Sequence, residues 1–176
     1  MTARETPAPA AAPTTHDRRM YALMNRGEAR PFHATAARRR LVVGAHVALT
    51  ALMVGSWGVA QAMDLTWPLF VMIGLLLPWC LATGVLNGAT RGLLELRGRM
   101  LDERQRAERD LIRARAHGVT LRLLLGGAFV FIVLHALGDR DVTVSLSYAL
   151  VVALAVHWLV PLWLAGLQAR DEPADD

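Results

Sequence analysis

Four long hydrophobic runs constrain the fold of this chain more than any other feature of its sequence. They cover residues 41–63, 67–89, 119–137 and 142–167, and none of them contains an aspartate or a glutamate. A helix of about 20 apolar residues crosses the roughly 30 Å hydrocarbon core of a bilayer, because each residue adds about 1.5 Å. The sequence therefore predicts an all-α integral membrane protein with four transmembrane helices.

The segments outside these runs divide the chain into three parts. Residues 1–38 begin with a Pro- and Ala-rich stretch and predict a disordered basic tail, although the stretch 17–30 is equally compatible with a short surface helix. Residues 39–169 hold the four-helix transmembrane domain. Residues 170–176 form an acidic tail.

The distribution of arginine predicts the orientation. All 19 basic residues are arginines: eight precede the first run, eight lie between the second and third runs, and Arg140 is the one in a short link on the other side. Cytoplasmic flanks of membrane helices carry the excess of basic residues. We therefore expect two helical hairpins with short outer links in the plasma (cell) membrane, with both termini and the middle segment in the cytoplasm.

The middle segment, residues 91–117, predicts a cytoplasmic helical extension that leads into the third span. Asp102 is a good N-cap, and Gln105 three residues later completes a capping-box pattern. Glu103 adds negative charge to the first turn, which favours the helix dipole. Gly118 is either a bend or a position through which one long helix continues.

The string that starts at Leu101 reads Leu-Asp-Glu-Arg-Gln-Arg, and Arg109 and Asp110 follow it. It resembles a motif before the third membrane helix in a group of uncharacterised actinobacterial four-helix integral membrane proteins. The resemblance implies the architecture and no activity. The stretch itself predicts a solvated, salt-bridged stem, or else a surface for a partner or anionic lipid. The candidate partner-binding residues are Asp102, Glu103, Arg104, Arg106 and Arg109.

Polar side chains inside the spans are candidates for function because they are expensive in hydrocarbon. These candidates are His46, Asn87 and His157. We expect a neutral histidine that bonds to a neighbouring helix. A haem site is disfavoured, because the depths of His46 and His157 differ by roughly 7 Å at 1.5 Å per residue.

Small residues recur every fourth position at Gly84, Gly88 and Gly92. This spacing lets helices approach closely. It predicts tight packing within one chain or, alternatively, self-association into a homo-oligomer.

The sequence contains no Gly-x-Ser-x-Gly, no metal-ligand cluster and no phosphate-binding loop, and its lone Cys80 cannot form an internal disulfide. We therefore expect no enzyme, cofactor or bound metal. Membrane topology accounts for the arginines, so no nucleic acid is expected. The favoured function is a partner-binding or scaffold (regulatory) membrane protein that acts through its Arg-rich segment. The alternative is a small transporter or transporter subunit, with a polar cavity near His46, Asn87 and His157.

Overall fold

The computed structural model describes residues 12–137 and 142–169. In these ranges all regular elements are helices, which confirms the all-α prediction. In chain order they are α1 (Thr15–Met24), η1 (Gly27–Ala29), α2 (Arg30–His33), α3 (Ala36–Met63), α4 (Trp67–Ala89), η2 (Gly98–Met100), α5 (Glu103–Leu137) and α6 (Val142–Gln168).

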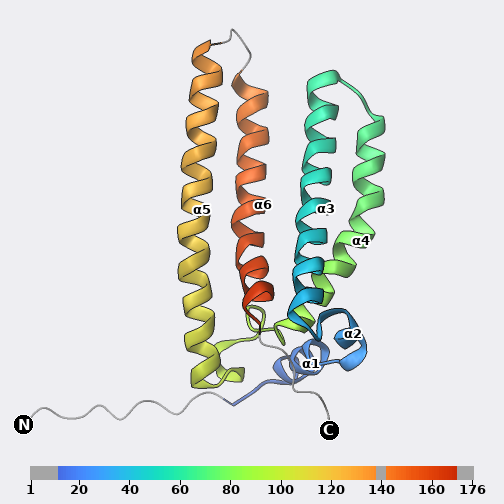
Figure 1. Ribbon diagram of the computed structural model, residues 1–176, viewed down its shortest axis with the longest axis vertical. Helices are drawn as coiled ribbons and strands as arrows, with labels where there is room; N and C mark the ends of the chain where they lie inside the picture. Colours follow the sequence, from blue (N-terminus) through green and yellow to red (C-terminus); the bar gives the residue numbers. More distant parts are fainter. Residues whose placement is uncertain (1–11, 138–141, 170–176) are drawn as a thin grey trace, which may run out of the picture.

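Four helices of the described chain, α3 to α6, are long and apolar enough to cross a membrane. They stand side by side with α6 between α5 and α3, while α4 packs along α3 (Figure 1). The first span is longer than predicted, because α3 begins at Ala36 and so includes the three arginines before residue 41. The Thr35 side chain accepts a hydrogen bond from the Arg38 backbone N–H and caps this start.

The helix start that the sequence predicts at Asp102 is confirmed. The Asp102 carboxylate accepts from the Gln105 backbone N–H at 2.6 Å, and the Asp102 N–H donates to the Gln105 side chain at 3.0 Å. From Glu103 the helix α5 runs for 35 residues and passes Gly118 without a break. The stretch before it differs from the predicted extension, because residues 91–102 form turns and the short η2.

Close packing between the spans gathers at one end of the bundle. Val43 of α3, Leu86 of α4 and Leu162 of α6 form a buried cluster there. Gly166 of α6 allows this approach, because a Cβ at that position would lie 3.1 Å from side-chain carbons of both Leu86 and Val43. The close packing of α3, α4 and α6 therefore lies at this end of the bundle.

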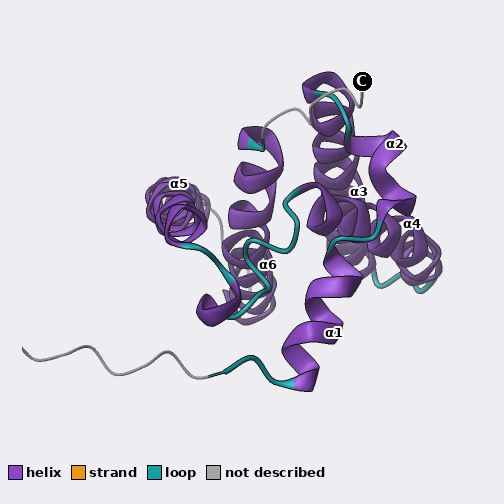
Figure 2. Cartoon of the chain, turned by 90° about the horizontal axis from the view of Figure 1, so that it is seen from below, coloured by secondary structure: helices purple, strands orange, loops and turns teal. Residues whose placement is uncertain are grey.

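A layer of short helices and turns covers the same end (Figures 1 and 2). It consists of α1, η1, α2, the linker formed by residues 91–102 and the first turns of α5. For residues 17–30 this agrees with the short surface helix rather than with the disordered tail, since α1, η1 and α2 are helical. Of these, α2 packs on α3 and α4, and η1 packs on α4. Residues 1–11 of that tail, like the acidic tail 170–176, lie outside the described residues. We call this assembly the terminal layer.

The glycine repeat contacts the terminal layer rather than another span. Gly92 lies beyond the end of α4 with a φ of +69°, and a Cβ there would come within 2.7 Å of Met24 of α1. A Cβ at Gly88 would lie 3.6 Å from the His33 Nε2 of α2, whereas a Cβ at Gly84 would meet open space. Two of the three glycines, Gly88 and Gly92, therefore contact the N-terminal helices of the same chain.

We predict that Asp102→Ala destabilises the start of α5 by about 1 kcal/mol, because the first-turn N–H groups lose their acceptor. Amide hydrogen exchange of residues 103–106 should become correspondingly faster. The control is Asp110→Ala, which removes an exposed acid from the interior of the same helix. Equal exchange at residues 103–106 in both variants would contradict the cap.

Candidate functional site

His46 is fully buried where α3, α4 and α6 meet. Its Nδ1 accepts a hydrogen bond from the Trp163 indole N–H at 2.9 Å, and its Nε2 lies 2.9 Å from the Thr83 hydroxyl oxygen. An indole nitrogen can only donate, so Nδ1 is the acceptor and the imidazole proton is on Nε2. The Thr83 hydroxyl in turn donates to the Trp79 carbonyl at 2.9 Å. The ring is therefore neutral and both its nitrogens are engaged.

A second set of bonds closes this network. The Thr50 hydroxyl donates to the His46 carbonyl at 2.8 Å and accepts from the Trp79 indole N–H at 2.9 Å. The Trp79 and His46 rings also lie with their centroids 5.0 Å apart. We call these five residues the histidine network: His46, Thr50, Trp79, Thr83 and Trp163. It leaves no ring nitrogen free for a ligand, and the described residues contain no group of three or more metal-binding side chains.

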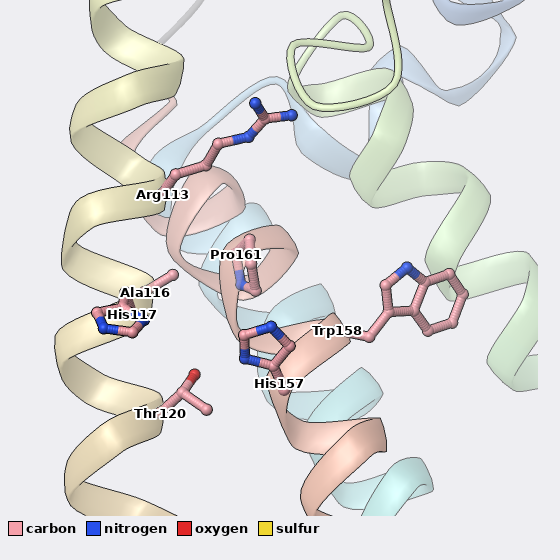
Figure 3. A pocket seen from close by; sticks show the side chains of 7 residues that line it. All are labelled: Arg113, Ala116, His117, Thr120, His157, Trp158 and Pro161. Carbon is pink, nitrogen blue, oxygen red and sulfur yellow. The ribbon is translucent and has the colours of Figure 1, made fainter.

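The other two intramembrane candidates lie elsewhere. The Asn87 backbone carbonyl accepts from the Gly92 N–H at 2.9 Å and from the Thr90 hydroxyl at 3.1 Å at the end of α4. Its side-chain Oδ1 is buried and has no hydrogen-bond partner among the described residues. His157 lines a cleft of about 330 Å³ between α5 and α6 (Figure 3). Neither His46 nor Asn87 lines that cleft. The three candidates therefore do not share the polar cavity that the transporter alternative predicts.

Two of the candidate partner-binding arginines hold the linker onto α5. The Arg106 Nε donates to the carbonyls of Gly98 and Leu101 at 2.8 and 3.0 Å. The Arg109 Nη1 donates to the Leu96 carbonyl at 3.2 Å, and only 14% of its side chain is exposed. Reversing these charges would therefore disrupt the linker itself, whatever else these residues bind.

The remaining candidates divide between cap and surface. Asp102 is occupied as the N-cap of α5. Glu103 and Arg104 are exposed in the first turn of the helix. Only these two of the five sequence candidates therefore have side chains that point freely to the outside of the terminal layer.

Asp17 is a buried charge that sequence reasoning missed. Its carboxylate accepts from the Thr14 backbone N–H and from the Arg99 Nε, both at 2.8 Å, and Arg97 lies 3.7 Å away. The Thr14 backbone hydrogen bond, aided by the Thr14 hydroxyl and by Arg99, lowers the pKa of Asp17 from 3.8 to about 2. The Thr14–Asp17 capping box was readable in the sequence. The partner arginines lie some 80 residues farther along the chain, so no sequence pattern pointed to them.

Arg39 makes a second buried link between distant parts. Its guanidinium donates to the carbonyls of His33 in α2 and Ala169 after α6. Only 3% of this residue is exposed. The N-terminal helices are therefore fixed both to the linker, through Asp17, and to the end of α6, through Arg39.

The surface of the terminal layer is rich in positive charge. Its exposed arginines outnumber its exposed acids, which are Glu28, Glu95, Asp102 and Glu103. The exposed arginines of the described chain in this layer are Arg18, Arg19, Arg26, Arg91, Arg97, Arg104 and Arg106, and the start of α3 adds the exposed Arg38 and Arg40. An excess of forked guanidinium groups favours carboxylates and phosphates as ligands.

We predict that Trp163→Phe lowers the free energy of unfolding by about 1 kcal/mol, because His46 loses its donor within the bundle. Trp158→Phe is the matched control, since this tryptophan of α6 is 68% exposed. Unfolding in a denaturing detergent series measures both. The network would not have its assigned role if the two variants were equally stable.

We predict that α1 stays attached at neutral pH and detaches in acid. The lowered pKa of Asp17 means that its ionised form stabilises the folded layer above about pH 4, and that this stabilisation is lost as the pH falls toward about 2. A spin label at an Arg19→Cys position, in a Cys80→Ser background, should become mobile across that range. Asp17→Asn should be mobile already at neutral pH. A label that stays immobile in Asp17→Asn would refute this attachment.

No protein-family model matches this chain, and no curated protein or solved structure shows significant similarity to it. The resemblance of residues 101–110 to an actinobacterial group therefore stays a prediction. No activity is transferred to the chain from a relative.

Proposed function

We propose that this chain is a non-catalytic, multi-pass protein of the plasma membrane that binds an acidic protein partner through its terminal layer. In this proposal both termini and the terminal layer lie in the cytoplasm. The arginine distribution supports that orientation, because sixteen arginines flank the inner ends of the spans and only Arg140 lies in an outer link.

The observation that carries the proposal is that the arginine-rich surface is folded in advance. Asp17 bonds to Arg99, and Arg106 and Arg109 bond to linker carbonyls. These contacts fix the backbone from which exposed side chains such as Arg18 and Arg104 project. A surface that is ordered before binding loses less conformational entropy when a partner docks. Such a surface suits recognition better than a flexible basic tail does.

The transporter alternative has weaker support. It calls for a polar cavity that His46, Asn87 and His157 share, whereas His46 is enclosed in its network and Asn87 does not line the cleft that His157 lines. No acidic side chain occurs in any of the four hydrophobic runs, which removes the usual proton carrier of a coupled exporter.

We predict that charge reversal on two elements of the layer, Arg18→Glu with Arg104→Glu, abolishes capture of a defined cytoplasmic partner. The full-length protein would be purified in mild detergent after cross-linking, and the captured protein would be identified by mass spectrometry. Each reversal should weaken binding at least about tenfold, because it replaces an attraction by a repulsion.

The control is Arg18→Lys with Arg104→Lys, which keeps the charge and should retain most of the capture. Both arginines are exposed, so neither pair of changes should affect folding. Capture of the same partner by the doubly reversed protein, at the affinity of the original, would contradict the proposal.

A further inference from the structure

The cleft between α5 and α6 lies at the end of the bundle that carries the terminal layer, and four polar side chains interrupt its otherwise apolar walls (Figure 3). Its α5 side is formed by one helical face, from Arg113 through His117 to Thr120. The seven helical steps from Arg113 to Thr120 extend over about 10 Å at 1.5 Å per residue. On the α6 side lie His157, Trp158 and Pro161. The cleft therefore leads from a charged end into the span.

The Thr120 hydroxyl is available to bond with a molecule in this cleft. Thr120 is 2% exposed, yet its Oγ1 has no hydrogen-bond partner within the described parts of the chain. Thr50 and Thr83 in the other spans behave differently, because each donates to the carbonyl four residues earlier. A buried polar group without a partner costs about 1–3 kcal/mol. Figure 3 shows the Thr120 oxygen on the side of α5 that faces His157.

Pro161 adds an acceptor at the same level. It lies inside α6 and has no backbone N–H, so the His157 carbonyl loses its usual helical donor. The cleft thus combines a guanidinium, two imidazoles and a hydroxyl with a carbonyl that is free to accept. Donors for an anion and an acceptor for a hydroxyl group lie within one space of about 330 Å³.

The same helix faces continue into an apolar pocket of about 960 Å³ farther along the bundle. On α5 the lining passes from Thr120 to Leu123, Leu124 and Gly127, at helical spacing. On α6 it passes from His157 to Ala153, one turn away. A molecule bound along this path would have a polar, anionic end near Arg113 and an apolar end between α3, α5 and α6.

We propose that this path binds an anionic glycerophospholipid. Its phosphate lies at Arg113 and His117, and an ester carbonyl of its glycerol accepts from the Thr120 hydroxyl. A headgroup hydroxyl donates to the His157 carbonyl, and the acyl chains occupy the apolar pocket. Arg113 is near the inner end of α6, since Arg115 beside it donates to Gln168 at 2.9 Å. The orientation proposed above therefore assigns the lipid to the cytoplasmic leaflet, whereas the site itself does not depend on any protein partner.

The test is native mass spectrometry of the full-length protein in detergent, titrated with phosphatidylglycerol or with phosphatidylcholine of the same chains. We expect one phosphatidylglycerol to bind about tenfold more tightly than phosphatidylcholine. Arg113→Gln should weaken phosphatidylglycerol binding about tenfold, since it removes a charged hydrogen bond. Thr120→Val should weaken it about fivefold, and Thr120→Ser, which keeps the hydroxyl, should restore it.

The matched control is Arg104→Gln, which removes an exposed charge from the same helix outside the cleft and should leave lipid binding unchanged. Equal loss in Arg104→Gln and Arg113→Gln would reduce the effect to general charge attraction and overturn the site. Equal affinity for the two lipids would overturn it too. So would displacement of the lipid by inorganic phosphate, which would make the ligand a free anion. The partner test changes Arg18 and Arg104, whereas the lipid test changes Arg113 and Thr120. Loss of partner capture and loss of lipid binding are therefore separate results.

Discussion

The imidazole of His46 sets the arrangement of the spans, because a polar ring inside a membrane bundle has no water to bond with. Each such group must find its partner within the protein. Trp163 of α6 and Thr83 of α4 supply those partners, and Thr50 and Trp79 complete the network. Three helices are thereby joined at one depth. The fourth helix, α5, has no member in the network, and among the other spans it packs extensively only on α6. The cleft and the apolar pocket therefore both adjoin α5.

The terminal layer depends on this junction of α3, α4 and α6. With these helices fixed, the start of α3, the end of α4 and the end of α6 come together beside the buried cluster of Val43, Leu86 and Leu162. Arg39 can then reach the carbonyl after α6. Asp17 can reach the linker that follows α4. The fold thus converts a basic N-terminal segment into a fixed surface.

Sequence reasoning succeeded where the determining forces are local. Hydrophobic length located four helices, and the Asp102–Gln105 pattern located the start of α5. It did not identify partners that lie far along the chain, namely Arg99 for Asp17 and Trp163 for His46. For the same reason the five candidate residues between 102 and 109 could not be divided between the surface and internal contacts from the sequence. Whether an arginine there faces solvent or a carbonyl depends on the fold of the linker.

The central claim, that His46 is a neutral and fully bonded junction, is tested most directly by nitrogen NMR of histidine-labelled protein in lipid bilayers. At neutral pH the account predicts one neutral tautomer for His46, with the proton on Nε2 and with Nδ1 as a hydrogen-bond acceptor. The tautomer with the proton on Nδ1, a charged imidazolium, or rapid exchange of the ring proton with water would contradict it.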